Sequence, residues 1–574
     1  MKRIDTDILI LGAGGAGLFA ALHAHKANPA LDITIAVKGL LGKSGCTRMV
    51  QGGYNVALAK GDSAVRHFMD TIEGGKWLND QDLAWLLVHE AQVRIRELEN
   101  ELGCFFDRNP DGTVHQKAFA GQTFDRTVHK GDLTGIEIVN RLAEQVWARG
   151  IARLEEHRAL ALVKTPDGSA LSGVLMLDMR AGSFVFVRAK AVLLATGGGP
   201  TMYKYHTPSG DKACDGMAMA LRAGLPLRDM EMVQFHPTGL LAGPDTRMTG
   251  TVLEEGLRGA GGWLTDRDGR RFMAEYDPKA ERATRDVVSR AIFDTIAKGR
   301  GTDLGGVYLE MRHLGPANVR RQFKGMVERC ADCGFDLAGD RVEVVPTAHY
   351  MMGGLPFAPD CTTALPGLFA AGEDTGGVHG ANRLGGNGVA NSTVFGGLAG
   401  ASMAKYVRAG AALRDADEAA IAAAIAEAVA PFGRKPVDLE AIREKLFETM
   451  WNDVGIVRDA RGLARAETAL DEFDASLDAA GVADGDRAFN LTWADWLNLK
   501  NLVAVSKTIR AAAAARDDSR GAHFRADHPA AGDLAASRYT LATLAGGRAQ
   551  VTTSPVAFTR VRPGQTLLEA EAAE

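Results

Sequence analysis

Two glycine-rich stretches of the sequence carry histidine and arginine side chains that could hold a small anion. They are residues 234–239 (QFHPTG) and 379–387 (HGANRLGGN), with Arg285 and His349 between them. An arginine binds a carboxylate with a planar fork, and a histidine donates from a defined ring nitrogen. Two histidines and two arginines on separate loops therefore predict a site that holds a small polyanion still while its carbon skeleton reacts. Such a reaction needs a cofactor.

The N-terminus shows the pattern of a dinucleotide-binding element. An apolar strand at residues 7–11 runs into GAGGAG at residues 12–17, and an alanine-rich helix follows. Glycines permit the tight turn and the close approach of a pyrophosphate, which the positive end of the helix attracts. The alternative is a glycine-rich turn without a ligand, but the position between a buried strand and a helix favours the nucleotide.

The next segments favour a flavin over a nicotinamide. The second strand, residues 33–37, is followed by Lys38 and not by the acidic residue that binds the ribose of NAD, so another group must hold the ribose. The glycine-rich loop at residues 43–53 suits an isoalloxazine ring, which needs a close backbone lining. A later β-run ends in ATGGG at residues 195–199, the second nucleotide signal of two-dinucleotide-binding flavoproteins. We therefore expect FAD.

The composition excludes several classes of protein. A formal net charge of −5 over 574 residues argues against a nucleic-acid binder. The six cysteines are too scattered for a disulfide framework. Cys330 and Cys333 have ligand-like spacing, but a single such pair is a weak signal and we expect no metal site. Without an apolar run of about 18 residues or room for a signal peptide, we expect a cytoplasmic protein with no direct membrane span.

Eight motifs together resemble the flavoprotein subunit family of succinate dehydrogenase and fumarate reductase, which also contains L-aspartate oxidase. The resemblance spans nearly the whole chain in the family's order. The motifs are residues 12–17, 51–53, 195–198, 234–239, 285–288, 346–354, 379–387 and 519–523.

The resemblance and the order of elements predict an α/β fold in which a two-dinucleotide-binding-type FAD domain is interrupted by an α+β capping domain. From about residue 411 the composition becomes rich in alanine and charged residues with helical periodicity, which predicts a helical domain. We place the FAD domain at residues 1–230 and 348–408, the capping domain at 231–347, the helical domain at 409–534 and a short C-terminal tail at 535–574.

The resemblance also implies roles for individual residues. Arg285 matches the arginine that transfers a proton to or from a C4 dicarboxylate, while FAD exchanges a hydride with the neighbouring carbon. The residues implied to bind the substrate are Phe119, His236, Glu254, Glu255, His349 and Arg383. An arginine is a poor base in water, so the role requires a dry pocket with neighbouring cations.

The residues expected to bind the cofactor come from the glycine motifs and from the loops around them. They are Gly12, Gly14, Gly15, Gly17, Lys38, Ser44, Cys46, Gln51, Gly52, Gly53, Thr196, Gly197, Asp215, Glu373 and Asn387.

Two positions depart from the family pattern. Cys46 stands where membrane-bound members have a histidine that bonds covalently to the flavin. We expect non-covalent FAD with Cys46 packed beside it, and a thioether is the alternative. Glu254 stands where the family usually has a threonine, and a carboxylate there would repel a substrate carboxylate. The alternatives are an amino-bearing or longer substrate, or a Glu254 turned into the protein.

The function predicted from these residues is the interconversion of a saturated dicarboxylate and its alkene, as in succinate and fumarate. The alternative within the family is an L-aspartate oxidase-like enzyme that oxidises an amino dicarboxylate. An assembly or electron-transfer subunit with a degenerate site is a third hypothesis, and the intact histidine and arginine set argues against it. The expected partner is an iron–sulfur subunit or another electron-transfer protein, and through it the chain could sit at the periphery of the inner membrane.

Overall fold

The computed structural model describes residues 1–244, 246 and 248–571. A seven-stranded sheet and the helices packed on it form one unit, which we call the base. The strand order is β6-β2-β1-β9-β8-β7, and β15 also pairs with β9. Strands β6, β2, β1, β9 and β15 run parallel, whereas β8 and β7 are antiparallel additions. The strands are β1 (Lys2–Leu11), β2 (Ile33–Val37), β6 (Ala152–Glu155), β7 (His157–Lys164), β8 (Leu171–Asp178), β9 (Ser183–Leu194) and β15 (Leu368–Ala370).

Two helices pack closely together against this sheet because glycines let their backbones approach. They are α1 (Gly15–Ala27) and α10 (Asn387–Arg408). A Cβ on Gly400 would lie 2.2 Å from the carbonyl oxygen of Ala20, and one on Gly396 would lie 2.5 Å from that of Ala16. The parallel strands and these helices form the dinucleotide-binding architecture expected from the sequence.

Further helices and short strands complete the base. Helix α4 packs on a short helix, η1 (Cys46–Met49), in the glycine-rich loop that follows β2. Strands β3, β5 and β4 form a separate small sheet. These elements are β3 (Tyr54–Asn55), α2 (Ala64–Gly74), α3 (Gln81–Asn100), β4 (Gln116–Lys117), β5 (Thr127–Val128), α4 (Thr134–Ala148) and α5 (Asp215–Arg222).

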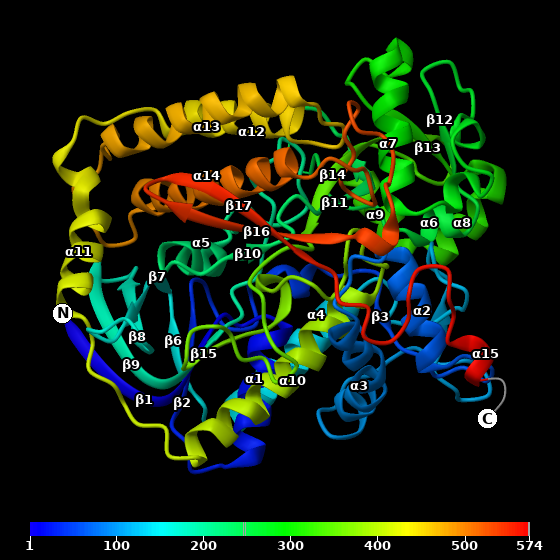
Figure 1. Ribbon diagram of the computed structural model, residues 1–574. Coiled ribbons are helices and arrows are strands. Elements are labelled where there is room, and N and C mark those ends of the chain that lie inside the picture. Colours follow the sequence, from blue (N-terminus) through cyan, green and yellow to red (C-terminus); the bar gives the residue numbers. More distant parts are fainter. Residues whose placement is uncertain (245, 247, 572–574) are drawn as a thin grey trace.

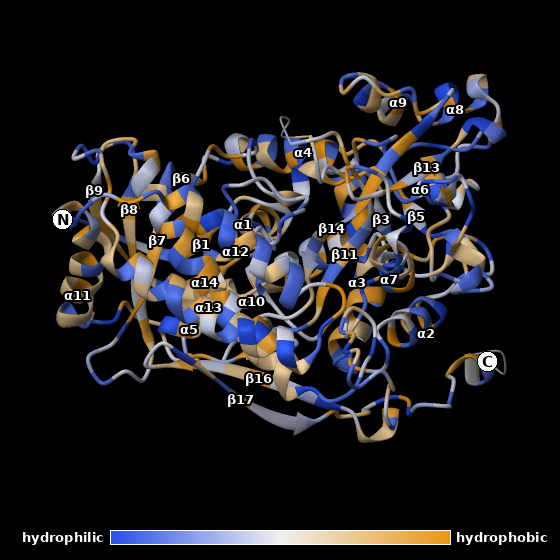
Figure 2. Ribbon diagram, turned by 90° about the horizontal axis from the view of Figure 1, so that it is seen from above, coloured by the Kyte–Doolittle hydropathy of each residue, from blue (hydrophilic) through white to orange (hydrophobic). Residues whose placement is uncertain are grey.

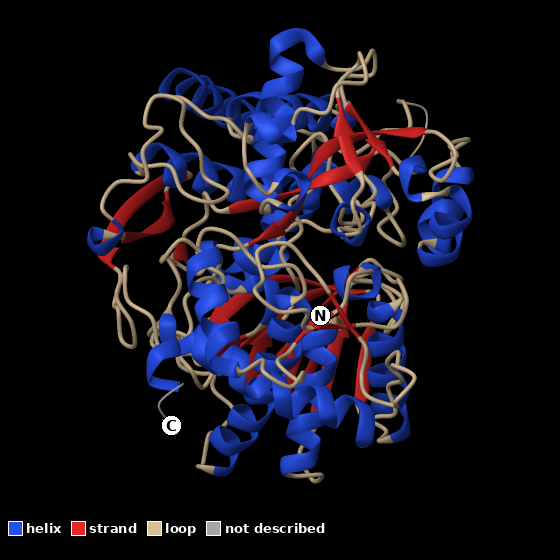
Figure 3. Cartoon of the chain, turned by 90° about the vertical axis from the view of Figure 1, so that its right-hand side faces the viewer, coloured by secondary structure: helices blue, strands red, loops and turns tan. Residues whose placement is uncertain are grey.

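The segment around residues 233–351 forms a second unit with its own four-stranded antiparallel sheet, in the order β11-β14-β13-β12. Figure 3 shows its strands apart from those of the base sheet. We call this unit the cap. Its elements are β11 (Val233–Leu240), α6 (Gly256–Gly259), β12 (Trp263–Thr265), α7 (Arg285–Thr295), β13 (Val307–Glu310), α8 (Pro316–Gln322), α9 (Lys324–Ala331) and β14 (Arg341–Met351).

Helices α12, α13 and α14 lie above the base in Figure 1, and α11 lies at its left-hand edge. A hairpin of β16 and β17 follows these helices in the chain. The helix α11 and the cap helices α8 and α9 lie at opposite ends of the molecule (Figure 2). Strand β16 of the hairpin pairs with β10 (Leu227–Arg228) of the base. The elements are α11 (Glu418–Val429), α12 (Leu439–Asp453), α13 (Ala460–Ala479), α14 (Leu491–Ala515), β16 (Arg538–Ala545), β17 (Arg548–Pro555) and α15 (Leu568–Glu571).

Two points of the fold qualify the sequence analysis. The last helix of the base starts at Asn387, where a glycine loop was expected, because Gly386 turns the chain with a φ of 89° directly before it. The exact domain boundaries stay predictions. Over the described residues, none of the helices is long and apolar enough to cross a bilayer.

Candidate active site

A cavity of about 640 Å³ runs between the base and the cap. At one end it meets the N-terminus of α1, where Gly14, Gly15 and Ala16 line it. Gly12 has a φ of 108°, and a Cβ there would lie 2.1 Å from the carbonyl oxygen of Ala195. Only glycine fits this turn, which brings backbone N–H groups and the positive helix end to the cavity. This end is therefore suited to a pyrophosphate.

The second strand, β2, is followed by Lys38 and not by an acidic residue. The structure brings an acidic residue to this place from the start of α5, namely Asp215. Asp215 accepts hydrogen bonds from Lys38 Nζ at 2.8 Å and from Arg158 Nη2 at 2.8 Å, and all three residues line the cavity. Burial opposes its ionisation, but Arg158 and Lys38 hold the pKa of Asp215 well below its usual range. Asp215 is thus a charged hydrogen-bond acceptor of the kind that a ribose requires.

Two adjacent acids follow β15. Glu373 lines the cavity, whereas Asp374 is buried beside it. Glu373 accepts from the backbone N–H of Met351 at 2.9 Å, and burial raises its pKa to about 7. Asp374 accepts from Thr196 Oγ1 at 3.0 Å and from the Gly197 N–H at 3.2 Å, and burial raises its pKa to about 7. Asp374 therefore fixes the second glycine loop, while Glu373 offers its carboxyl group to the cavity.

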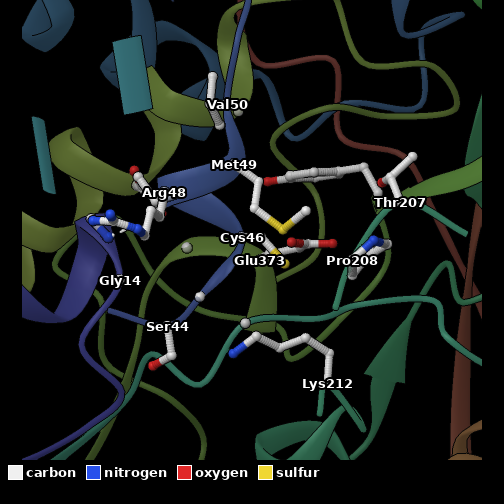
Figure 4. Close-up of a pocket in the computed structure, with 18 of the residues that line it drawn as sticks. Gly14, Ser44, Cys46, Arg48, Met49, Val50, Thr207, Pro208, Lys212 and Glu373 are labelled. Carbon is white, nitrogen blue, oxygen red and sulfur yellow. Dashed lines mark hydrogen bonds between the residues drawn. The ribbon is translucent and has the colours of Figure 1, made fainter. Parts of the chain in front are cut away.

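Cys46 lies beside Glu373 and Met49 in the cavity (Figure 4). Burial, with a contribution from the negative charge of Glu373, raises the pKa of the Cys46 thiol to about 12. Forming a thioether requires the thiolate, and this environment keeps the sulfur protonated.

The groove between these groups fits FAD. Its glycine turns leave room for a pyrophosphate, and its acids Asp215 and Glu373 could accept hydrogen bonds from ribose and ribityl hydroxyls. At the far end, a Cβ on Gly52 would lie 2.6 Å from the Phe119 ring, so a side chain there would fill the space beside the ring. The predicted cofactor residues that line the cavity are Gly12, Gly14, Gly15, Lys38, Ser44, Cys46, Gln51, Gly52, Gly53, Thr196, Gly197, Asp215 and Glu373.

Two predicted cofactor residues do not line the cavity. A Cβ on Gly17 would lie 2.0 Å from the Gly12 carbonyl oxygen, so Gly17 serves the turn itself. Asn387 is fully buried, where its Oδ1 accepts from Asn55 Nδ2 at 2.9 Å and its Nδ2 donates to Thr71 Oγ1 at 3.2 Å. It ties α10 to the base.

At the other end of the cavity, Arg285 is held by two buried partners. Its Nη2 and Nε donate to Glu255 Oε2 at 2.7 and 3.1 Å, and its Nη1 donates to Gln234 Oε1 at 3.0 Å. Arg258 Nη2 donates to the other oxygen of Glu255 at 3.3 Å. Burial opposes the charge of Glu255, but Arg285 and Arg258 lower its pKa. The result is a buried row of alternating charges, Arg258–Glu255–Arg285.

Arg383 presents unused donors in the same cavity. Its guanidinium lies 4.3 Å from the centre of the Tyr350 ring, and its Nε has no hydrogen-bond partner. Burial and the charge of Arg285 lower its pKa to about 10, so it is still a cation at neutral pH. Gln234 connects the two arginines, because its Nε2 donates to the Arg383 carbonyl oxygen at 2.7 Å. A buried cation with free donors is suited to an anion.

Two histidines complete this end. The rings of His236 and His349 lie 5.4 Å apart, and the pKa of each is well below its usual value because of burial and the nearby Arg285. Both are therefore neutral. The Thr238 N–H donates to His236 Nδ1 at 3.3 Å, which leaves the proton of His236 on Nε2. Phe119, Glu254 and Glu255 also line this cavity, so all the predicted substrate residues lie around one space with Arg285.

Glu254 lies in the wall of this space and faces Lys117. Its Oε2 is 3.6 Å from Lys117 Nζ, is closed to solvent and has no hydrogen-bond partner. Burial raises the pKa of Glu254, and Lys117 partly counteracts this effect. Of the alternatives left open by the sequence, this geometry favours a Glu254 turned into the protein.

The site also includes residues that the sequence analysis did not single out. Arg258 follows Glu255 by three residues on α6, a spacing that puts both on one helix face and could have identified it. Tyr350 is the neighbour of His349. Gln234 was seen only as part of a motif. Lys212 lines the cofactor end from a loop, and no sequence signal marks it.

A second cavity of about 550 Å³ lies behind this end. Phe119 and Glu255 belong to the linings of both cavities. The second one is also lined by Arg258 and by the exposed residues Glu73, Lys279 and Arg282. The buried charge row therefore leads from the main cavity toward solvent.

The fold and the glycine-lined groove define an FAD-dependent oxidoreductase. Residues 7–389 match the FAD binding domain family, and residues 443–568 match the family described as fumarate reductase flavoprotein C-term. The chain belongs to the fumarate reductase and succinate dehydrogenase flavoprotein family.

Individual relatives agree with this assignment over the whole chain. The CoM/CoB fumarate reductase of Methanothermobacter marburgensis has one subunit that is 41% identical over 537 residues, which cover 92% of this chain and 95% of that one. The fumarate reductase flavoprotein subunit of Haemophilus influenzae is 34% identical, covering 100% and 98%. The structure of a variant of E. coli quinol fumarate reductase superposes with a TM-score of 0.92 at 34% identity, covering 99% of each chain.

Proposed function

We propose that this enzyme interconverts succinate and fumarate, or a dicarboxylate pair closely similar to them. The observation that carries the proposal is the buried Arg285, which is fixed by Glu255 and Gln234 in a cavity shared with Arg383 and the two histidines. Bound FAD supplies the redox chemistry, by taking a hydride from the saturated acid or returning it to the alkene.

The carboxylates of the substrate are held by Arg383, His236 and His349. Arg383 offers a charged fork, and the neutral imidazoles donate hydrogen bonds without adding further positive charge. Negative charge that develops on the carbon skeleton during the reaction spreads toward these carboxylates. Fixed donors in a buried site stabilise that charge without having to reorganise.

Arg285 transfers the proton at the carbon next to the one that exchanges the hydride. In the direction of reduction, a guanidinium N–H of Arg285 gives its proton to carbon. The Glu255 carboxylate then takes a proton from Arg258 and passes it to Arg285. Arg258 lies on the other oxygen of Glu255 and borders the second cavity, from which water replaces the proton. The pocket is dry and cationic, as an arginine acid–base group requires.

The FAD is proposed to be bound without a covalent bond to Cys46, because the thiol is buried and protonated. Acid precipitation of the protein tests this point. The yellow colour should stay in the supernatant, and colour that stays with the pellet would support a thioether.

The electron-transfer partner is proposed to be an iron–sulfur subunit. The relatives described above are named as subunits, which supports a complex. Their names also favour fumarate chemistry over the oxidation of an amino dicarboxylate. We propose a cytoplasmic location, at the membrane periphery if that partner is membrane-bound.

The function is tested by anaerobic flavin spectroscopy. Succinate should bleach the oxidised enzyme, and fumarate should restore the colour of dye-reduced enzyme. A flavin spectrum that responds to neither compound would reject the proposed substrate class. Arg285→Lys should bind FAD normally but give no turnover.

A further inference from the structure

The cap packs as a unit with an apolar core of its own. In the described part of the chain, every buried member of this core lies between Leu240 and Val344. The buried apolar residues of the base and the helical segment form other clusters. At the start of β11 and the end of β14, Val233, Phe235, Ala348 and Met351 belong to the cluster of the base, so apolar packing anchors the cap there. At the edge formed by α9 and residues 250–258, the buried apolar residues belong only to the core of the cap, so contacts of another kind join the cap to the base at that edge.

The contacts at one edge of the cavity are polar. Arg329, on α9 of the cap, lies against the amide of Gln51 in the base, while within the cap its Nη1 donates to the Val252 carbonyl oxygen at 3.1 Å. The carboxylate of Asp132 in the base lies directly against Gly325 of α9, where a Cβ would meet its Oδ2 at 1.8 Å. This edge therefore joins the two units through hydrogen bonds and charges.

Lys117 and Glu254 face each other in the middle of that edge. Lys117 belongs to the base, where its Nζ donates to the Gly131 carbonyl oxygen at 3.0 Å. Glu254 belongs to the cap, and its Oε2 lies 3.6 Å from the same nitrogen. The glutamate is 5% exposed and the lysine 22% exposed, so water screens the pair only in part.

The groups around Glu254 allow its negative charge to attract a positive charge of the base. Burial raises its pKa, Lys117 and Arg329 lower it, and Asp132 raises it. Glu254 lines the cavity, but its oxygen Oε2, which faces Lys117, is closed to solvent and has no hydrogen-bond partner. Lys117 is the oppositely charged partner within ion-pair distance.

We propose that Lys117 and Glu254 form a clasp that holds the cap closed over the cavity. Glu254 is then a positioning residue. It sets the place of the next residue, Glu255, and through it that of Arg285. The hydrogen-exchange test of this inference needs no substrate. Only the kinetic test rests on the proposed function.

The direct test is hydrogen exchange of the FAD-loaded enzyme without substrate, followed in the peptides of α9 and of residues 250–258. Glu254→Gln and Lys117→Met should each raise exchange there by about fivefold, as expected for the loss of one partly buried ion pair. Peptides of α13 should not change. Lys117→Glu combined with Glu254→Lys should restore slow exchange.

Asp336→Asn is the matched control. It breaks the Arg320–Asp336 ion pair, which lies within the cap and is about half exposed, at 50% and 49%. Exchange at residues 250–258 should not respond to it. Unchanged exchange in both Glu254→Gln and Lys117→Met, or a reversed double variant no better than the single ones, would overturn the clasp.

Kinetics with the dicarboxylate give a second readout. Loosening the clasp should raise KM about fivefold in Glu254→Gln, and the reversed pair should bring it back. If Glu254→Thr lowers KM while exchange of the cap is unchanged, Glu254 acts on the substrate and the clasp is rejected. If no dicarboxylate reacts with any variant, the proposed function fails, while the exchange experiment still decides the clasp.

Discussion

The two ends of the main cavity are built in different ways. The cofactor end is made mostly of backbone, with glycine turns at Gly12 and Gly53 that no other residue could adopt without strain. The substrate end is made of charged side chains from distant parts of the chain, such as Arg285 and Arg383. One end therefore depends on local geometry and the other on tertiary assembly of charge.

This difference predicts different consequences of mutation. A change at the cofactor end should cost folding and FAD binding together, because the backbone itself must move. A change at the substrate end should leave the fold and FAD in place and act on the reaction. The predictions that follow test this separation.

The largest effect is expected at the substrate end, in Arg285→Lys. Lysine keeps the charge but cannot contact Glu255 and Gln234 at once, so the proton donor is misplaced. We expect kcat to fall by about 10³-fold or more, in the range of a lost general acid. Steady-state fumarate reduction measures this fall. An unaltered flavin absorbance and melting temperature would confirm that the fold is intact.

Gly12→Ala, at the cofactor end, should instead lower folding stability and FAD binding. The new Cβ would lie 2.1 Å from the Ala195 carbonyl oxygen at a residue whose φ is 108°. We expect a loss of about 3 kcal/mol of folding free energy together with weaker FAD binding, measured by urea unfolding and flavin titration. Gly485→Ala is the control, because a Cβ there meets nothing within 4 Å. Equal effects of the two substitutions would contradict the steric account.

Arg383→Met should raise KM more than it lowers kcat. The substitution keeps much of the volume beside Tyr350 but removes the charged fork. Losing a charge-assisted hydrogen bond to a carboxylate should raise KM by about 10- to 100-fold. The measurement is the substrate dependence of the initial rate. A normal KM would remove Arg383 from the binding site.

The smallest effect concerns pH and folding stability. The pKa of His379 is well below its usual value, as are those of His236 and His349, because of burial and the nearby arginines. Below a pH of about 6.5 the unfolded chain takes up protons that the folded chain refuses. Each of these histidines should therefore lower stability by about 1.4 kcal/mol per pH unit as the pH falls. Glu373 and Asp374, whose pKa values are raised to about 7, act in the opposite direction over the same range, so the effect of one histidine is read as the difference between wild type and a variant.

Urea unfolding at several pH values checks this sign. His379→Asn should make the slope between pH 6 and pH 5 shallower by about one histidine's share. The same slope in wild type and His379→Asn would show that His379 is not held neutral in the folded protein.

The same contrast explains what the sequence could predict. The turn at residues 12–17 is local, so its pattern alone indicated the nucleotide site. Asp215 belongs to a helix about 180 residues away from Lys38, so the sequence could name it only as a residue near the second glycine motif and could not predict its contact with Lys38. The orientation of Glu254 could not be predicted, because it depends on Lys117, which lies in another unit of the fold.

The most direct test of the central claim is a single turnover of anaerobically reduced enzyme with fumarate, followed by flavin absorbance. The claim is that Arg285, aligned by Glu255, delivers the proton in the cavity that holds the flavin. Wild type should regain its colour about 10³-fold faster than Arg285→Lys, with fumarate bound in both. Equal rates in the two enzymes would contradict the account.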